Sequence, residues 1–586
     1  MLSANPDWHR LSVYVKPKVE STYWKALSMH KINVSELTFS DGSVVDLRPD
    51  SKLILVGPNN SGKSQALRDL MCLVSKNQPG EPIVIKDIEV QFQGEPATYE
   101  AHVKSIAEWD KQNSRYIRGQ QTIAVNHCAH WGNKERLNLL SGLHFKHVSS
   151  KDRTEICNPP NGVAPDAVKQ KPQHFLFEDE ALMGKASALF GAAFGPDLMF
   201  DFKGTINLRI HVGNTPDRTE ERFKDRVGDE YVNAVRAQPT LHTQGDGMKS
   251  YAGIMFEVLT GSSDVMLLDE PEAFLHPPQM QRLGHMLVSE AQGQLIVATH
   301  SSDILRGVLE GVGGDALILR LRRDGDVNLI CQAEPATIRE LWQRPELKYS
   351  NALEALFHDQ AVLCEDDGDC RLFNAMADHT AAADNKPLPD TAYVPTGGKH
   401  TIAKIATILR KTGVPTKAIY DIDVLNDGKV IREAVEAFGG DWSLARPKWK
   451  ALDDLVRNGI PAKDEAAIKT EIVTLLDDPK TVGLPKGEVT EIMKQTSAWN
   501  AVKRKGVATL SDPTAKTAFA DLDAYLSSIG IYVIELGEVE NFSSSIGGHG
   551  RKFITRLLEE VDLGDAELDE LRAFCHKVHL GEAGAL

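Results

Sequence analysis

The sequence lacks several features that would place it in a special class. Its 586 residues include only seven cysteines, none in a CxxC pair, so a zinc ribbon or a disulfide scaffold is not expected. No run of about 18 apolar residues occurs, so no membrane span is predicted. Met1–Lys16 has no apolar core of the kind found in signal peptides. We therefore expect a cytoplasmic protein with reduced thiols.

A surplus of basic residues is also missing. The formal net charge is −16, which does not suggest a protein that coats DNA through bulk charge. A local basic groove or bound metal ions would still outweigh this average at one site. The hydrophobic fraction of 42% and the charged fraction of 25% are ordinary for a globular chain. At roughly 100–200 residues per domain, the length predicts two domains with large insertions or about three to five smaller units.

A glycine-rich loop follows the apolar, strand-like run Lys52–Val56 and precedes the helical segment Gln65–Val74. The loop matches the pattern G-x-x-x-x-G-K-[ST], whose backbone N–H groups cradle phosphates at the start of a helix. In this pattern the lysine reaches the β and γ phosphates and the serine hydroxyl holds Mg²⁺. The nucleotide-binding residues predicted here are Gly57, Asn59, Asn60, Ser61, Gly62, Lys63 and Ser64.

Two later apolar strands carry polar residues at their ends. Asp269 and Glu270 follow Val265–Leu268, where an aspartate can bind Mg²⁺ and the next glutamate can polarise the attacking water. His300 follows Leu295–Ala298 and is a candidate γ-phosphate contact. An acidic turn and a structural histidine are the alternatives, but the phosphate-binding loop favours a role in catalysis.

These residues resemble the ABC-type ATPases, including their SMC-like branch. Asp269–Pro277 is similar to the family's D-E-P-E-x-x-L-H-P, and Thr299–Ser301 to its T-H-S switch. In the family, two heads sandwich ATP, and each head offers a signature motif to the nucleotide of the other. The candidate signature is Thr243–Gly247, with Thr243 and Gly245 as the residues that would contact ATP.

The second half alternates short strands with helical segments, which predicts a mostly parallel sheet. The strand candidates are 361–364, 392–395, 417–420 and 531–536. Carboxylates follow three of these strands, and the ends of parallel strands meet at one sheet edge. Because like charges repel, such a cluster calls for hard divalent cations, Mg²⁺ or Mn²⁺. The predicted metal ligands are Ser64 and Asp269 in the first half, and Glu365, Asp369, Asp421, Asp423, Glu538 and Glu540 in the second.

Two metal ions about 4 Å apart stabilise the attacking and leaving oxygens of a phosphodiester displacement. The spacing Asp421-x-Asp423 suits a shared metal centre at a strand end. Ordinary acidic turns are the alternative interpretation.

The acidic pattern resembles the Toprim domain, with a glutamate after the first strand and D-x-D after a later one. Glu365–Asp369 stands where that family often has E-G-x-x-D, with Asp366 in place of the glycine, and Leu536–Asn541 is similar to the G-[DE]-x-E segment of OLD nucleases. The whole chain therefore resembles the overcoming-lysogenization-defect (OLD) family, which includes the Gabija nuclease subunit and OLD-type retron effectors.

This resemblance implies an ATP-binding or ATP-hydrolysing, metal-dependent DNA endonuclease that acts in anti-phage defence. It implies a homodimer or larger homo-oligomer, with DNA as partner and a helicase or a reverse transcriptase–msDNA complex as further candidates. Glu270, His300, Glu365, Asp421 and Asp423 would be catalytic. The family's C-terminal basic residue would be Lys552, with Arg551 as second choice and Lys399 as a further option.

The predicted fold class is α/β, with an ABC-type ATPase domain at 1–345 and a Toprim nuclease domain at 346–586. The first contains an insertion within about 100–236, which could serve dimerisation, and the second a helical insertion at about 428–528.

An SMC-like clamp for DNA or a partner, with an inert Toprim platform, is the alternative function, favoured by Asp366. A topoisomerase or primase is less well supported, because no companion zinc region is evident. Arg320, Arg322 and Arg323 are interpreted as a solvated strand face.

Overall fold

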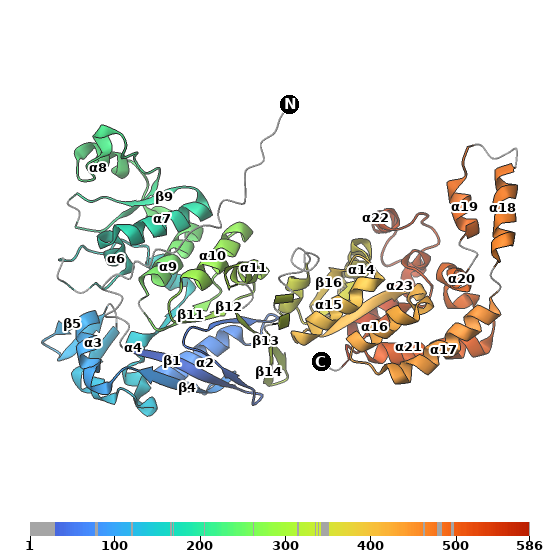
Figure 1. The fold of residues 1–586 in the computed structure, drawn as a ribbon, viewed down its shortest axis with the longest axis horizontal. Helices are drawn as coiled ribbons and strands as arrows, with labels where there is room; N and C mark the ends of the chain where they lie inside the picture. Colours follow the sequence, from blue (N-terminus) through green and yellow to red (C-terminus); the bar gives the residue numbers. More distant parts are fainter. Residues whose placement is uncertain are drawn as a thin grey trace.

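The computed structural model describes residues 30–584, except 77–79, 119–120, 165–166, 168, 204–205, 262, 313–315, 335, 338, 341–350, 461–462, 478–482 and 494–496. The expected domain change at 345/346 lies outside the described residues. Figure 1 shows two lobes side by side along the longest axis, with the N-terminal half in blue to green and the C-terminal half in yellow to red. Among the described helices, none combines the length and the apolar character that crossing a membrane requires.

A six-stranded sheet forms the centre of the N-terminal lobe, in the order β14-β13-β3-β12-β11-β8. Five strands run parallel, and β14 pairs antiparallel with β13 at one edge. The strands are short and almost wholly apolar, as expected for a sheet covered on both faces. Their bounds are β3 (Lys52–Val56), β8 (Phe145–Val148), β11 (Val265–Asp269), β12 (Gln294–Ala298), β13 (Leu317–Asp324) and β14 (Val327–Gln332).

Alternate residues of these strands face two different hydrophobic cores. Leu53 and Leu55 join the core that includes α2 and an antiparallel sheet of order β2-β1-β4. Ile54 and Val56 join the core formed with α9, α10 and α11. The elements named here are α2 (Lys63–Ser75), β1 (Lys31–Phe39), β2 (Val44–Asp46), β4 (Ile85–Gln93), α9 (Asp246–Thr260), α10 (Pro277–Glu290) and α11 (Ser302–Val312).

The stretch expected to contain an insertion contributes the edge strand β8 to the central sheet. The rest of it forms a small antiparallel sheet of order β5-β6-β7, a two-stranded sheet of β9 and β10, and short helices. These elements are α3 (Tyr99–Ile106), β5 (Glu108–Asp110), β6 (Arg115–Arg118), β7 (Gln121–Ala124), α4 (Ser141–His144), α5 (Ser150–Glu155), α6 (Pro172–Glu178), α7 (Glu180–Phe194), β9 (Asp197–Phe200), β10 (Ile210–Gly213) and α8 (Asp229–Arg236).

The C-terminal lobe has a four-stranded, all-parallel sheet in the order β16-β15-β17-β18. The four strands correspond to the four predicted ones, so the expected α/β class is confirmed. They are β15 (Gln360–Cys364), β16 (Thr391–Pro395), β17 (Thr416–Asp421) and β18 (Ile531–Ile534). The covering helices are α14 (Asp367–Asp384), α15 (Lys399–Lys411), α22 (Arg551–Glu560) and α23 (Asp569–Leu580).

The described residues between β17 and β18 form helices and the loops that join them, with no strand. In Figure 1, α18 and α19 project from the outer end of this lobe. Since β17 and β18 are adjacent in the sheet, this long excursion returns the chain to the neighbouring position. The helices are α16 (Gly428–Ala437), α17 (Trp442–Gly459), α18 (Glu465–Asp477), α19 (Lys486–Met493), α20 (Ala498–Lys505) and α21 (Pro513–Ser528).

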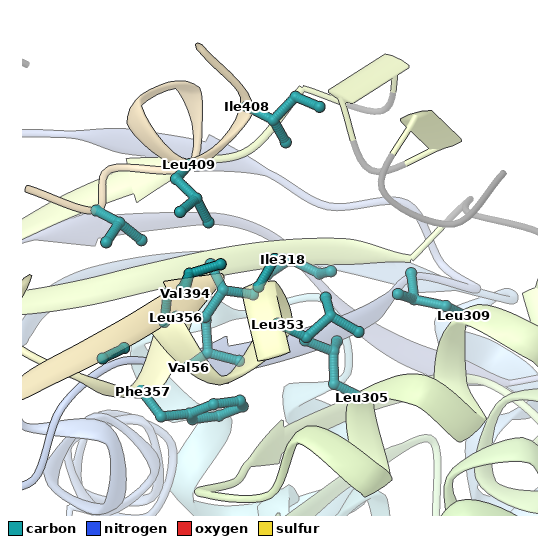
Figure 2. Packing of buried hydrophobic residues seen from close by; sticks show 14 of the residues in the cluster. Val56, Leu305, Leu309, Ile318, Leu353, Leu356, Phe357, Val394, Ile408 and Leu409 are labelled. Atoms are coloured by element: carbon teal, nitrogen blue, oxygen red, sulfur yellow. The ribbon is translucent and has the colours of Figure 1, made fainter. Parts of the chain in front are cut away.

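The two lobes share one hydrophobic core at their junction, where the 3₁₀ segment η7 (Asn351–Phe357) packs between them (Figure 2). Leu305 and Ile318 from the first lobe belong to the same cluster as Leu409 from the second. Arg320 is buried at this junction, and its guanidinium donates to the carbonyls of Leu356, His358 and Gly413. The expectation of a solvated face was therefore wrong for Arg320, because its guanidinium is enclosed by backbone carbonyls of η7 and of the second lobe.

Candidate nucleotide and metal sites

The glycine-rich loop joins β3 to α2, as the sequence predicts. Gly57 and Gly62 have φ angles of 140° and 97°, in the region that favours glycine. A Cβ atom on Gly57 would lie 2.2 Å from the carbonyl oxygen of Leu321, so the site also excludes a side chain sterically. The ammonium of Lys63 donates to the carbonyls of Gly57 (2.7 Å) and Pro58 (2.8 Å), and burial lowers its pKa to about 8.

The hydroxyl of Ser64 donates to a carboxylate oxygen of Asp269 over 2.8 Å. The two predicted Mg²⁺ ligands of the nucleotide site are therefore in direct contact, although 205 residues separate them. An open cavity of about 430 Å³ lies beside them. Its lining includes the loop residues Asn59–Ser64 together with Glu270, His300 and Asn328.

A hydrogen-bonded network connects the ends of β11 and β12. The Glu272 carboxylate accepts the Thr299 hydroxyl (2.9 Å) and the His300 backbone N–H (2.6 Å). The side chain of His300 then lies with Nε2 3.7 Å from a carboxylate oxygen of Glu270. Burial, followed by the charge of Lys63, lowers the pKa of His300, which favours the neutral imidazole. Glu272 was not among the predicted site residues, although it is the second glutamate of the D-E-P-E-x-x-L-H-P pattern.

The candidate signature residues lie elsewhere on the same lobe. Thr243 ends the short 3₁₀ segment η6 (Leu241–Thr243), and Gly245 precedes α9. Neither residue lines the cavity beside Lys63. The loop instead contacts the segment after Glu270, since a Cβ atom on Gly247 would lie 2.6 Å from the carbonyl oxygen of Phe274. Within one chain, the structure therefore does not bring the signature to its own nucleotide site.

Three predicted carboxylates of the second lobe converge at the carboxyl edge of its sheet. Glu365, Asp421 and Asp423 each place one oxygen within 4.8 Å of the others. Burial raises the pKa of Asp421 to about 8, and burial together with the charge of Asp423 raises that of Glu365. One oxygen each of Glu365 and Asp423 is buried without a hydrogen-bond partner among the described residues. Such a set of oxygen donors fits a hard divalent cation.

Two lysines contact this group of carboxylates. The ammonium of Lys399, at the start of α15, lies 3.0 Å from Asp423. The ammonium of Lys503, on α20, lies 3.1 Å from Asp423 and 3.4 Å from Asp421. Burial acts to lower the pKa of Lys503, but the two aspartates outweigh it and raise that pKa. Lys503 was not predicted, because it lies in the helical insertion 80 residues beyond Asp423.

Two of the remaining predicted ligands belong to a second group. Glu538, Glu540 and His549 each place one candidate ligand atom within 4.8 Å of the others, and sequence reasoning missed His549. Burial raises the pKa of Asp369 to about 7, and neighbouring carboxylates that include Glu365 and Glu540 act in the same direction. Five of the six predicted carboxylates therefore fall into two groups, and Asp369 belongs to neither.

The candidate basic residues of α22 lie apart from these contacts in the described structure. Lys552 is exposed at the start of the helix and is not among the lysines that contact Asp421 or Asp423. Arg551 lies 3.3 Å from Asp366. Asp366 itself caps α14 by accepting the Gly368 N–H, so its replacement of the family glycine has a structural reason.

Comparison with known proteins gives two family matches in the order expected. Residues 53–306 match the family described as "AAA domain, putative AbiEii toxin, Type IV TA system". Residues 356–423 match the family described as "Overcoming lysogenization defect protein-like, TOPRIM domain". The chain has the ATPase–Toprim architecture of the OLD proteins. The expected fold class is thereby confirmed, with an ABC-type ATPase domain followed by a Toprim domain.

One curated relative is the Old nuclease of Escherichia phage P2, which is 25% identical over 174 residues. That match covers 28% of this chain and only 29% of the phage protein. Because the shared part is well under two thirds of the relative, its activity is not transferred by similarity alone.

Solved SMC head domains also resemble the chain at low similarity. An SmcHead bound to the C-winged helix domain of ScpA is 15% identical, with a TM-score of 0.29 and coverage of 52% of this chain and 98% of that one. The SMC head domain from Thermotoga maritima is 12% identical, with a TM-score of 0.26 and coverage of 52% and 99%. At these scores, the fold assignment rests on the strand order and the two family matches.

Proposed function

We propose that the protein is an ATP-hydrolysing, divalent-metal-dependent DNA endonuclease. The observation that carries this proposal is the convergence of Glu365, Asp421 and Asp423 with two lysines at one sheet edge. Carboxylates gathered in this way hold cations, and nearby ammonium groups attract a phosphodiester backbone. A nucleotide site in the same chain supplies a means of regulating cleavage.

In the nucleotide site, the loop N–H groups and Lys63 bind the phosphates of ATP, the substrate of this site. Ser64 and Asp269 hold the Mg²⁺ that accompanies ATP, as their direct contact supports. Glu270 accepts a proton from the attacking water as general base. His300, held by Glu272 through its backbone N–H, orients toward the same water and the γ-phosphate.

In the nuclease site, Glu365, Asp421 and Asp423 would hold one divalent cation, and Asp369, Glu538 and Glu540 would contribute to a second. Bound Mg²⁺ or Mn²⁺ supplies an activated water and neutralises charge on the scissile phosphate. The chain's own part is to fix the carboxylate oxygens and to present the ammonium groups of Lys399 and Lys503 to the phosphate. In this proposal, Lys399 and Lys503 take the role beside the scissile phosphate that the sequence analysis gave first to Lys552.

We further propose that two copies assemble through the surface that carries the signature loop. Phe274 supports this assembly, because its side chain is 59% exposed and its backbone contacts the loop at Gly247. Thr243 and Gly245 of one copy would then reach the nucleotide held by the other. A role in anti-phage defence, with a helicase or a reverse transcriptase–msDNA complex as partner, remains a prediction from the family resemblance.

The clamp alternative drew its support from Asp366, which has a capping role instead. The two functions are distinguished by incubating the purified protein with supercoiled plasmid, with Mg²⁺ or Mn²⁺, and with or without ATP. We expect metal-dependent nicking or cutting that Asp421→Ala/Asp423→Ala loses while it still binds ATP. Cutting that survives in this variant would refute the metal assignment. A wild type that binds ATP but cuts under none of these conditions would favour the clamp.

A further inference from the structure

A buried arginine lies directly behind the proposed general base. Arg153 is on α5, the short helix that follows the edge strand β8, and its side chain is 0% exposed. One terminal nitrogen, Nη1, donates to the backbone carbonyl of Glu270 over 3.0 Å. The other, Nη2, donates to the hydroxyl of Ser150 over 2.7 Å. The guanidinium therefore ties the main chain of Glu270 to a separate helix.

The backbone of Glu270 needs such support. Its φ angle is 47°, in the left-handed region that residues with a side chain rarely adopt. Strained conformations of this kind persist where the surrounding structure holds them, and they cluster at functional sites. The Glu270 N–H donates to the carbonyl of Ala298 on β12 over 2.9 Å. The peptide groups of Glu270 are thus held on both sides, by β12 through the N–H and by Arg153 through the carbonyl.

The position of Arg153 is itself fixed by close helix packing. A Cβ atom on Gly253 of α9 would lie 2.0 Å from the carbonyl oxygen of Arg153, so only glycine allows α5 and α9 to approach this closely. α9 is the helix that begins at the candidate signature loop. Arg153 therefore connects the general base to the element that would face the second copy.

The charge of Arg153 also matches its surroundings. Burial lowers the pKa of its guanidinium, and the carboxylates of Glu272, Asp269 and Glu270 act in the opposite direction. Three carboxylates at the ends of β11 and its following turn would repel one another without a cation. Arg153 supplies a positive charge in addition to that of Lys63, and its hydrogen bonds to Glu270 and Ser150 fix its own position.

We propose that Arg153 is a positioning residue for ATP hydrolysis, which holds Glu270 in its left-handed conformation so that the carboxylate faces His300 and the nucleotide. The inference rests on the proposed ATPase activity of this site. Arg153 does not itself line the cavity, and its hydrogen bond to the Glu270 carbonyl connects it to a residue that does, so we expect it to act through Glu270. Its removal should therefore lower kcat and leave the affinity for nucleotide unchanged.

The test compares Arg153→Met, which keeps the apolar stem, with Lys151→Ala on the exposed side of the same helix. We expect Arg153→Met to lower kcat for ATP by about 10- to 100-fold, since small misplacements of catalytic groups cost this much. We expect ATP binding to stay at the wild-type level, and Lys151→Ala to hydrolyse ATP normally. Ser150→Ala removes one hydrogen-bond partner of the guanidinium and should give a smaller loss of kcat. This variant provides the test if Arg153→Met does not fold.

Two further readouts separate positioning from a general structural role. In a Glu270→Gln background, Arg153→Met should cause no additional loss of hydrolysis, because both changes act through one carboxylate. A crystal structure of Arg153→Met should show Glu270 relaxed out of the left-handed region. Wild-type kcat in both Arg153→Met and Ser150→Ala, or additive losses with Glu270→Gln, would overturn the proposal.

The backbone conformation of Glu270 also separates a failure of the proposed ATPase activity from a failure of the positioning role. If the wild type hydrolyses no ATP, the proposed function of this site fails, and the conformation of Glu270 in Arg153→Met still decides the positioning role. A Glu270 that keeps its left-handed φ in this variant would contradict that role in either case.

Discussion

The two acidic sites of this protein are stabilised in different ways. In the nucleotide site, Asp269 accepts the Ser64 hydroxyl and Glu272 accepts Thr299 and the His300 N–H. In the Toprim site, buried oxygens of Glu365 and Asp423 have no hydrogen-bond partner among the described residues. The nucleotide site is therefore held in place by hydrogen bonds within the chain. In the Toprim site, Lys399 and Lys503 pair with Asp421 and Asp423 but leave buried carboxylate oxygens that a divalent cation can bind.

This difference indicates how each site depends on its ligands. Hydrogen bonds from fixed donors hold a geometry before any ligand arrives, which is the basis of preorganised catalysis. Buried carboxylates with raised pKa values, such as Asp421 at about 8, lack that support and gain it from bound metal ions. We therefore expect mutations in the nucleotide site to act on the rate, and changes at the Toprim site to act on both rate and stability.

The largest effect that would test this contrast is expected for Glu270→Gln. Because general base catalysis contributes about 10²–10⁴-fold, ATP hydrolysis should fall by that factor while ATP binding is retained. Hydrolysis is measured as phosphate release, and binding by calorimetry. A loss of binding equal to the loss of rate would show that the nucleotide site is not preorganised as described.

Lys503→Met should lower DNA cleavage by about 10²-fold, since charged groups aimed at a transition state contribute at least this much. The loss should appear in the cleavage rate at saturating Mn²⁺, and metal affinity should not weaken, because Lys503 and the cation both interact with Asp421 and Asp423. Lys505→Met, on the exposed side of the same helix, is the matched control. Unchanged cleavage by Lys503→Met would remove this lysine from the proposed mechanism.

Metal ions should stabilise only the lobe with the unbalanced carboxylates. At a Mn²⁺ concentration 100 times its Kd, linkage predicts about 2.7 kcal/mol of stabilisation, seen as a higher melting temperature. Asp421→Ala/Asp423→Ala should lose this increase, whereas Ser64→Ala should keep it in the absence of ATP. An equal increase in all three proteins would indicate nonspecific binding.

The smallest effect concerns acid sensitivity of the N-terminal lobe. Burial lowers the pKa of His102 to about 4, below its unfolded value of about 6.5. The unfolded chain then takes up a proton that the folded chain does not, so stability is complete above pH 6.5 and is lost as the pH falls toward 4. We expect a loss of about 1–2 kcal/mol at pH 5, reduced in His102→Gln. Parallel pH profiles of the two proteins, measured by thermal unfolding, would contradict this assignment.

Motifs that are local in the sequence were predicted well. The phosphate-binding loop and the pair Asp269–Glu270 depend on neighbouring residues and on one strand each, so spacing alone identifies them. The strand before Glu365 and the strand that ends at Asp421 are also identified from local sequence, because each is a short apolar run with a carboxylate at its end.

Residues that act through long-range contacts were not predictable. Lys503 reaches Asp421 and Asp423 only because α20 of the helical insertion packs against the segment that follows β17. No local pattern distinguishes it from other lysines of the insertion. Arg153 is part of a polar helix in the sequence, yet the close packing of α5 on α9 buries it behind Glu270. In each case, the tertiary contact determines the role of the side chain.

Anomalous diffraction from crystals grown with Mn²⁺ is the most direct test of whether the Toprim carboxylates form a metal site. We predict a strong anomalous peak among Glu365, Asp421 and Asp423, with a second near Asp369 and Glu540. The absence of any peak at these carboxylates, under conditions in which the protein cuts DNA, would contradict the claim.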